Sequence, residues 1–464
     1  MGQHGAMDNR DTPDAGTATQ GPHVGSPADS TGVGARACAE AAWAWTLSQV
    51  RWDGDGPWVP VRVPAGVPAA DDLEPAPERD EVYQGIGGIG LALAEVRLTR
   101  EWTAAERSLA DQVVARLRTA DLRGDCGLYT GLAGSMTVIG LLGGGRDDDL
   151  LTRLGELRTP LGWPSPEYEQ APLNDLLMGT AGIVLTMLWY GGAETSRLAA
   201  LGADALGATA RPTASGVEWK MYEGDRDRLM PNYSHGTAGI ATALAVAGRQ
   251  LDRPELVELA RLGAEQLVSL ADTSGDGFRA PLQIPAAEGY EDFCYGWCHG
   301  PTGTANLFGA LELAGVKEVG GRTPTAWRAA AARTLASSGL PERRYDGFWD
   351  NDGRCCGTAG VLDAVLNLVQ VTGESEHLAF ANRLAAAIVE RSEPSPADPR
   401  QRYWRFYEHR VRPPYLDPGV GWMQGAAGVA AALFRYARVR ERGVDAERLA
   451  FPDDWWMTPA GHPV

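Results

Sequence analysis

Residues 232–250 read NYSHGTAGIATALAVAGRQ, and this stretch contains the unit that decides the fold. The pair Gly236-x-x-Gly239 is followed by a run that is apolar on nearly every side, which is typical of a fully buried helix. The same form recurs along the chain in units spaced about 45 to 70 residues apart, which indicates internal repeats. The first glycines of the seven units are Gly85, Gly131, Gly179, Gly236, Gly300, Gly357 and Gly425.

More polar runs with apolar residues at helical spacing lie between the glycine pairs, for example at residues 254–272 and 376–390. Each repeat is therefore expected to be a hairpin of one buried helix and one amphipathic helix. Seven hairpins predict an all-α fold of two concentric rings, in which seven outer helices shield seven inner helices from water. An open solenoid would use the same unit, but it leaves a wet concave side, whereas these inner helices are apolar on almost all faces.

Glycine is unusually abundant, with 58 residues in a chain of 464 against a usual share of ~7%. We expect the repeated glycines to let the backbone enter each inner helix at a tight turn and approach the neighbouring repeat closely. A side chain at these positions would prevent that approach, because its Cβ atom would occupy the space.

The chain has 42 Lys and Arg residues against 60 Asp and Glu residues, a formal net charge of −18. This balance argues against a nucleic-acid partner, because neutralising phosphates requires clustered cations. Apolar runs stay well below the ~20 residues of a membrane span and a signal peptide is not visible, so we expect a cytoplasmic protein without a membrane span. Residues 1–35 are rich in Gly, Asp, Ser, Thr and Pro, which predicts a flexible N-terminal tail before a single domain of residues 36–464.

Chemically active side chains stand just before the first glycines of four consecutive repeats. Asp175 and His235 belong to the third and fourth repeats, four residues and one residue before the first glycine. Cys298 belongs to the fifth repeat, and Cys355 and Cys356 belong to the sixth, all within two residues of the first glycine. Because the inner helices of a ring start at the same end, these five side chains are predicted to meet at one mouth of the barrel.

Cys298, Cys355 and Cys356 are candidate ligands of a zinc ion. Six cysteines are too few for a disulfide scaffold of this length, and clustered cysteines in a reducing compartment more often bind metal or act in catalysis. Three protein ligands would leave the fourth position for water or substrate, as in catalytic sites. Buried cysteines are often small core residues, but two adjacent cysteines are a strained choice for a core. Cys294 and His299 remain open as replacement ligands.

His235 and Asp175 are candidate catalytic residues. Histidine is the side chain best matched to proton transfer near neutral pH, and His235 is level with the thiols. An aspartate before a helix start is also a good N-cap, so position alone leaves the role of Asp175 open.

Three motifs in this chain resemble those of one known family: NYSHGTAG at 232–239, WCHGPTG at 297–303 and CCGTAG at 355–360. In this order, and together with the seven glycine pairs, they are similar to the motifs of the LanC-like lanthionine synthetases, which are lanthipeptide cyclases. The resemblance covers roughly residues 36–440. It implies an α/α toroid of seven inner and seven outer helices with a zinc ion at the mouth.

The resemblance also implies a substrate, because members of the family close thioether rings in a precursor peptide. The Ser and Thr residues of that peptide have first been dehydrated to dehydroalanine and dehydrobutyrine. Carried over by motif, Cys298, Cys355 and Cys356 would bind zinc, and His235 and Asp175 would be the catalytic residues. Many members have Cys-His where this chain has two cysteines, so the chain is similar to the three-thiolate subgroup. Since a dehydratase, kinase or lyase segment is not visible, dehydration is expected from a separate protein.

Other functions fit the same residues and stay open. A zinc-bound thiol could instead be alkylated by a prenyl diphosphate, which needs a basic pocket, or glutathione could be added to dehydrated proteins. A non-enzymatic scaffold that binds peptides would need the fourth zinc position filled by protein, from Cys294 or His299. The arginines near the motifs are Arg343, Arg344, Arg354, Arg410 and Arg412.

Overall fold

The computed structural model describes residues 31–64, 73–122, 124–222, 224, 228–342, 351–407 and 412–454. The chain separates into residues 1–30, which lie outside these ranges, and a unit that begins at Thr31. Most of the expected tail of residues 1–35 therefore falls outside the described residues, and the first helix already begins at Thr31.

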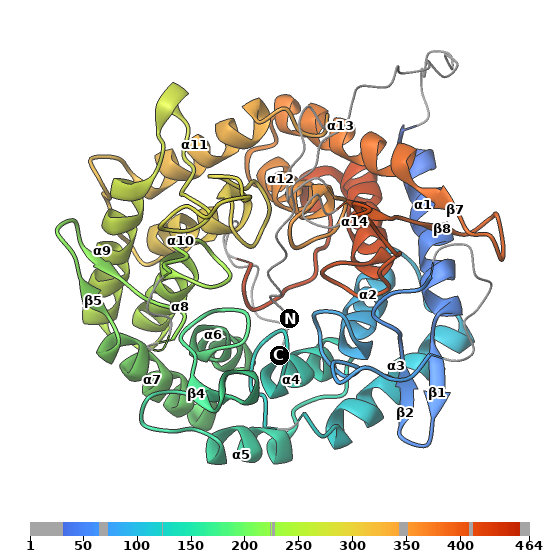
Figure 1. Ribbon diagram of the computed structural model, residues 1–464, viewed down its shortest axis with the longest axis horizontal. Helices are drawn as coiled ribbons and strands as arrows, with labels where there is room; N and C mark the ends of the chain where they lie inside the picture. Colours follow the sequence, from blue (N-terminus) through green and yellow to red (C-terminus); the bar gives the residue numbers. More distant parts are fainter. Residues whose placement is uncertain are drawn as a thin grey trace, which may run out of the picture. The chain divides into compact units, whose positions relative to one another are not determined.

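Seven helices of the described unit form an inner ring (Figure 1). Each begins directly after the first glycine of a repeat, and nearly all of its residues are buried. Each contacts the next helix of the ring, and the last contacts the first, so the ring is closed. The inner helices are α2 (Ile86–Thr99), α4 (Leu132–Leu141), α6 (Thr180–Tyr190), α8 (Thr237–Gln250), α10 (Pro301–Leu313), α12 (Thr358–Thr372) and α14 (Ala426–Arg442).

An outer ring of helices covers the inner ring with one apolar face. In α9, for example, the buried residues Leu256, Ala260, Ala264 and Leu267 follow helical spacing and face α8. The all-α toroid predicted from the repeats is confirmed. The outer helices in the described ranges are α1 (Thr31–Ser48), α3 (Ala104–Thr119), α5 (Asp148–Glu156), α7 (Ala193–Ala208), α9 (Pro254–Leu270), α11 (Pro324–Ser337) and α13 (Ser375–Arg391).

The seventh repeat differs from the expected hairpin, because its outer helix comes from the other end of the chain. α1 packs along α14, the last inner helix, and also contacts α13. Trp43 of α1 is buried, and its indole N–H donates a 2.7 Å hydrogen bond to Glu106 on α3. α1 therefore joins the last repeat to the first in the outer ring.

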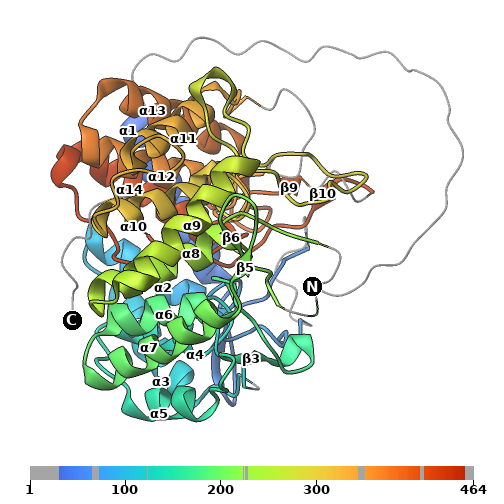
Figure 2. The same ribbon diagram turned by 90° about the vertical axis from the view of Figure 1, so that its left-hand side faces the viewer.

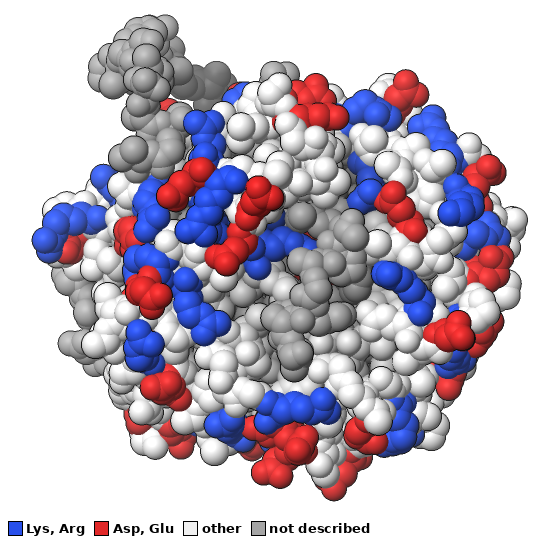
Figure 3. Space-filling view, turned by 180° about the vertical axis from the view of Figure 1, so that it is seen from behind, with Lys and Arg blue, Asp and Glu red and all other residues white. Residues whose placement is uncertain are grey.

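Short antiparallel strand pairs lie in the loops that lead into the inner helices. Figure 2 shows several of them gathered at one face of the ring, which we call the mouth face. On the opposite face, Figure 3 shows positive and negative side chains interspersed around the rim. The strand pairs are β1 (Arg51–Asp53) with β2 (Gly56–Trp58), β3 (Pro164–Ser165) with β4 (Ala171–Pro172), β5 (Arg211–Pro212) with β6 (Val217–Glu218), β7 (Glu393–Pro394) with β8 (Arg402–Tyr403), and β9 (Phe406–Tyr407) with β10 (Tyr415–Leu416).

A closed series of backbone hydrogen bonds joins all seven repeats just before the inner helices. In every repeat the residue two positions before the first glycine donates its N–H to the carbonyl of the corresponding residue in the next repeat, at 2.9–3.2 Å. The last bond runs from Met423 to Tyr83 and closes the series. Side chains from repeats far apart in sequence are therefore held at one level. We call these residues the backbone belt: Tyr83, Tyr129, Leu177, Ser234, Cys298, Cys355 and Met423.

The repeated glycines are needed for space, as the sequence predicts. Gly236 has an extended backbone with a φ of −145°, which any residue can adopt, but a Cβ there would lie 1.5 Å from the carbonyl oxygen of Met230. A Cβ on Gly239 would lie 2.0 Å from the carbonyl oxygen of Tyr233 and 3.0 Å from the Cβ of Leu176 in the preceding repeat. The absence of a Cβ at the first glycine thus leaves room for the loop of the same repeat, and its absence at the second leaves room for the neighbouring repeat.

The chain after α14 reaches back into the centre of the ring. The hydroxyl of Tyr129 donates a 2.9 Å hydrogen bond to Oδ2 of Asp453, and the hydroxyl of Tyr233 donates to its backbone carbonyl at 2.5 Å. A cavity of about 80 Å³ lies beside this segment, and its lining includes Trp297 and Arg354, the residues that precede Cys298 and Cys355. The segment that carries Asp453 therefore packs inside the ring, against tyrosines that lie next to or within the belt.

Candidate metal centre

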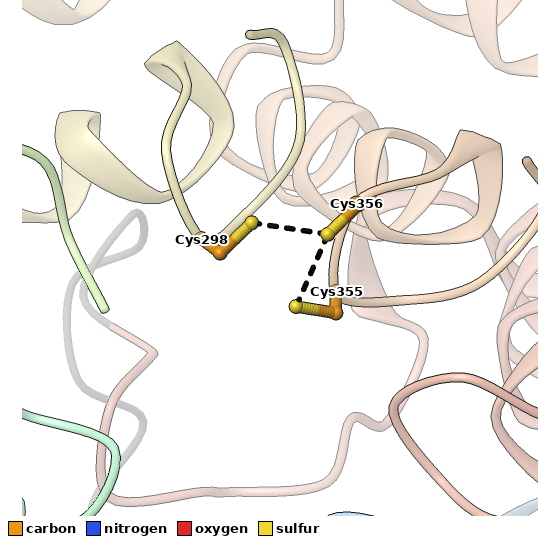
Figure 4. A group of neighbouring side chains, drawn as sticks. All are labelled: Cys298, Cys355 and Cys356. Atoms are coloured by element: carbon orange, nitrogen blue, oxygen red, sulfur yellow. Dashed lines mark hydrogen bonds between the residues drawn. The ribbon is translucent and has the colours of Figure 1, made fainter. Parts of the chain in front are cut away.

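The belt brings the three predicted zinc ligands together. Cys298 precedes α10, and Cys355 and Cys356 precede α12, so two loops supply the three thiols. The Sγ atoms of Cys298 and Cys356 are 3.2 Å apart, and those of Cys356 and Cys355 are 3.4 Å apart. Figure 4 shows the three side chains pointing toward one another. Within the described residues they form a group whose ligand atoms all lie within 4.8 Å of one another.

The cluster is buried, with each thiol residue about 3% exposed and none of the three in a disulfide. Hydrogen bonds from Cys298 and Cys356 hold the pKa of Cys355 well below its usual value, and the charge of nearby His235 adds to this effect. Hydrogen bonds to Cys294, Cys355 and Cys356, together with burial, raise the pKa of Cys298. Among the three thiols, Cys355 is therefore the one whose ionisation the cluster favours most.

The donor set fits a zinc ion. Zinc–sulfur bonds of ~2.3 Å in a tetrahedron place sulfurs roughly 3.8 Å apart, so the sulfurs need to separate only slightly to bind the ion. Thiolates are soft ligands that zinc prefers, and a set of three leaves one coordination position for another ligand.

The two alternative ligands lie next to the cluster but outside it. Cys294 is buried, but it does not belong to the group of thiols whose sulfur atoms all lie within 4.8 Å of one another, which consists of the three predicted cysteines. The ring of His299 lies 5.7 Å from the ring of His235, and its Nδ1 is buried without a hydrogen-bond partner among the described residues. Burial, with the charges of His235 and Arg228, lowers the pKa of His299 to about 3, so this imidazole is neutral.

His235 and Asp175 form a hydrogen-bonded pair beside the thiols. Nδ1 of His235 lies 2.6 Å from Oδ2 of Asp175, whose side chain is fully buried. The other carboxylate oxygen accepts a 3.1 Å hydrogen bond from the backbone N–H of Met178, so Asp175 also holds the turn before α6. Because an ionised carboxylate only accepts hydrogen bonds, it keeps the proton of the neutral imidazole on Nδ1 and leaves Nε2 as the basic nitrogen.

The sequence analysis missed Tyr83 and Gln424, which stand beside the thiols in the first and seventh repeats. Nε2 of Gln424 donates a 3.0 Å hydrogen bond to the hydroxyl of Tyr83. Burial and the charges of Cys355 and Cys356 raise the pKa of Tyr83, so the phenol keeps its proton. Tyr83 is a belt residue, so alignment of the repeats at the position of Cys298 would have singled it out.

Comparison with known sequences identifies the family of this chain. The sequence model described as lanthionine synthetase C-like protein matches residues 76–443, which include all seven glycine pairs and the five predicted site residues. The chain belongs to the lanthionine synthetase C-like family. α1 and the segment that reaches the central cavity lie outside the matched residues of this LanC-like protein.

The solved structures that resemble this LanC-like protein have low sequence identity to it. Nisin cyclase aligns with a TM-score of 0.53 and 17% identity over 78% of this chain and 89% of that chain, which shows a shared fold. The unsaturated glucuronyl hydrolase from Bacillus sp. GL1 aligns over 93% of this chain and 99% of that chain, with a TM-score of 0.39 and 13% identity. Among curated protein sequences, none matches this LanC-like protein. Across its described ranges, every helix is too short or too polar to cross a bilayer.

Proposed function

We propose that this LanC-like protein is a zinc-dependent lanthipeptide cyclase. The observation that carries the proposal is the meeting of three buried thiols with the His235–Asp175 pair at one mouth of a toroid. Membership of the LanC-like family and the fold shared with nisin cyclase support it. The substrate would be a precursor peptide with dehydroalanine or dehydrobutyrine residues, prepared by a separate dehydrating enzyme. We place this chemistry in the cytoplasm.

Cys298, Cys355 and Cys356 would hold the zinc ion and leave one position open. Bound there, zinc would lower the pKa of the peptide's cysteine thiol, so that this cysteine reacts as a thiolate. The three protein thiolates together carry −3 against the +2 of the ion, so this chain's ligands leave the site with a net negative charge. We expect that excess charge to keep an incoming sulfur nucleophilic and easily released.

His235 would move the proton that the reaction requires. The peptide thiolate adds to the β-carbon of the dehydroamino acid, and the resulting enolate takes a proton at its α-carbon. One C–S bond and one C–H bond form, and the proton lost by the thiol balances the proton gained by the carbon. Nε2 of His235 is the candidate acid, because Nδ1 is bound by Asp175.

Asp175 would act by fixing the tautomer and the orientation of His235. Its full burial and its second hydrogen bond to Met178 hold the carboxylate in place. A carboxylate in this position also stabilises the imidazolium that forms when Nε2 accepts a proton. The arrangement thus favours His235 as the group that exchanges protons and Asp175 as its support.

A direct test uses a synthetic peptide that contains one cysteine and one dehydroalanine. Incubated with the zinc-loaded protein, the peptide is expected to keep its mass and lose its iodoacetamide-reactive thiol faster than without protein. Glutathione or a prenyl diphosphate is added in parallel reactions. A mass increase by either group would support the other thiol-alkylation functions, and a peptide that binds with its thiol unchanged would support the scaffold.

The arginines near the motifs give little support to prenyl transfer as an alternative function. The guanidinium of Arg354 lies over the ring of Trp422 at 4.3 Å and donates a 2.7 Å hydrogen bond to Asp363, so its charge is already paired. Arg343, Arg344 and Arg410 lie outside the described residues.

A further inference from the structure

His299 stands in the ring between the proton-exchanging histidine and the thiols. It directly follows the belt residue Cys298 in the fifth repeat. Belt hydrogen bonds of 3.0 and 3.1 Å join Cys298 to the fourth and the sixth repeats. The residues at the position of His299 in those two repeats are His235 and Cys356. In the order of the ring, His299 is therefore flanked by the candidate acid on one side and by a thiol of the metal centre on the other.

The imidazoles of His299 and His235 are close enough to contact one residue of a bound peptide. Their ring centroids are 5.7 Å apart, the rings are tilted by 38° to each other, and both residues are partly exposed. The α-carbon and the carbonyl oxygen of one peptide residue are about 2.4 Å apart. A dehydroamino acid residue can therefore present its α-carbon to one ring and its carbonyl oxygen to the other.

The two rings offer opposite hydrogen-bonding groups. Asp175 holds Nδ1 of His235 at 2.6 Å, which leaves Nε2 of that ring as an acceptor. Nδ1 of His299 is buried and has no hydrogen-bond partner among the described residues. A neutral imidazole carries one hydrogen, and a buried unpaired N–H is rarer in proteins than a buried unpaired acceptor. The hydrogen of His299 is therefore assigned to Nε2, so this ring presents a donor.

We propose that Nε2–H of His299 donates a hydrogen bond to the carbonyl oxygen of the dehydroamino acid residue that the peptide's sulfur attacks. The proposal rests on the proposed cyclase function. As the C–S bond forms, the C=C electron pair shifts toward the carbonyl carbon, and the C=O pair moves onto the oxygen to give the enolate. His235 then supplies a proton to the α-carbon and the C=O bond forms again. His299 keeps its hydrogen throughout and stabilises the negative oxygen, as the donors of an oxyanion hole do.

Other roles explain His299 less well. The group of metal-binding side chains in the described ranges consists of three cysteines and does not include this imidazole. Packing does not require a histidine here, because an apolar side chain would fill the same space without leaving a buried nitrogen unpaired. The nitrogen that remains for a ligand is Nε2, which supports a function for this edge of the ring.

The first test reads the position of the ring hydrogens without turnover. Nitrogen-15 NMR of the zinc-loaded protein, labelled in its histidines, distinguishes the two neutral tautomers and the charged ring. His299 is expected in the Nε2–H form and His235 in the Nδ1–H form at neutral pH. The variants His299→Gln and His235→Asn each remove one set of signals and so assign them. An Nδ1–H or a charged ring at His299 would overturn the proposal.

The second test uses His299→Gln and His299→Asn as a matched pair. The amide nitrogen of glutamine reaches the place of Nε2, whereas that of asparagine reaches only the place of Nδ1. The glutamine variant is expected to close rings within about tenfold of the parent rate. The asparagine variant and His299→Leu are expected to be slower by about 10²- to 10³-fold, with the zinc content unchanged. The KM for the peptide is expected to change little, because the oxygen becomes negative only as the reaction proceeds.

The outcomes separate this proposal from the cyclase function. If the parent closes rings and the glutamine and asparagine variants do so at equal rates, the donor role of Nε2 is overturned while the cyclase function stands. Loss of zinc from all three variants would make His299 a metal ligand and would also overturn the proposal. If the zinc-loaded parent closes no rings, the cyclase function and this proposal fall together.

Discussion

The backbone N–H of Met423 donates a 2.9 Å hydrogen bond to the carbonyl of Tyr83, and this bond joins the last repeat to the first. It completes a belt in which Cys298 and Cys355 are direct neighbours, because the N–H of Cys298 donates to the carbonyl of Cys355 at 3.1 Å. The backbones of two cysteines that are far apart in the sequence are thereby joined directly by a hydrogen bond. The hydrogen bonds that close the ring thus belong to the same series as the one that positions two of the thiols.

The first prediction concerns the metal itself. Cys355→Ala is expected to lose both zinc, measured by elemental analysis, and cyclisation of a dehydrated peptide, because two thiols cannot hold the ion as three do. Cys126→Ala is the matched control, since Cys126 is also a buried free cysteine in a loop that leads into an inner helix. A Cys355→Ala protein that cyclises at full rate without metal would remove the metal from the mechanism.

The second prediction separates proton transfer from metal binding. His235→Asn is expected to retain zinc while the rate of ring closure falls about 10²- to 10⁴-fold, because the general acid is lost. His377→Asn on α13 is the control and is expected to cyclise at the unchanged rate. The outcome that would reassign the proton donor is a His235→Asn protein that forms rings as fast as the parent.

The third prediction tests the support given by Asp175. Asp175→Asn presents an amide N–H₂ or a weaker acceptor to Nδ1, so it is expected to disturb the tautomer and slow cyclisation with zinc still bound. In the double variant with His235→Asn, the loss is expected to be little larger than with His235→Asn alone, since both act through one imidazole. Fully additive losses, measured as single-turnover rates, would give Asp175 a separate role.

The sequence predicted the parts of this protein that depend on repetition. The glycine pairs mark where each inner helix begins, and counting back from them placed Asp175, His235 and the cysteines at one level. The structure confirms the rings and brings these five side chains to one mouth. The prediction succeeded because every repeat needs a glycine at the same point of its backbone. Residues at the same distance from that glycine therefore occupy equivalent places in the ring.

Contacts made once, between segments far apart in the chain, were not predictable in this way. The pairing of α1 with α14 could not be inferred from the repeats, because α1 lies before the first glycine pair and the apolar face of a helix does not identify its partner. The hydrogen bond between Gln424 and Tyr83 joins residues 341 positions apart, and polar side chains at those positions carry no information about their partner. The return of Asp453 into the ring likewise depends on tertiary structure alone.

A fourth prediction tests whether a repeat glycine far from the thiols is required for close packing. A Cβ on Gly182 would lie 2.1 Å from the carbonyl oxygen of Leu176 and 2.9 Å from the Cβ of Leu128 in the preceding repeat. Gly182→Ala is therefore expected to lower the free energy of unfolding by about 3 kcal/mol or more. Gly155→Ala in α5 meets only Leu198, at 3.8 Å, and is expected to change stability by less than ~1 kcal/mol. Equal melting temperatures for the two variants would contradict the demand for close approach.

The last prediction concerns the pH dependence of stability at Asp453. Burial raises the pKa of Asp453 from 3.8 to about 7. The neighbouring charge of Asp454 raises the pKa further, while the hydrogen bond from Tyr129 and the charge of Arg354 oppose the increase. Between these two pKa values the folded protein keeps a proton on Asp453 that the unfolded chain has lost. Stability from this group is therefore present below about pH 4 and is lost as the pH rises to about 7.

Asp453→Asn is expected to remove this loss of stability at higher pH. An amide stays neutral, and its oxygen can still accept a hydrogen bond from the hydroxyl of Tyr129. Relative to the parent, the free energy of unfolding of the variant is expected to rise by about 2 kcal/mol between pH 5 and pH 8. Urea denaturation at several pH values, with the same free zinc concentration for both proteins, measures the difference. Parallel curves for the two proteins across this range would show that Asp453 is ionised in the folded state, and the segment after α14 would then need a cation beside it to remain in the centre of the ring.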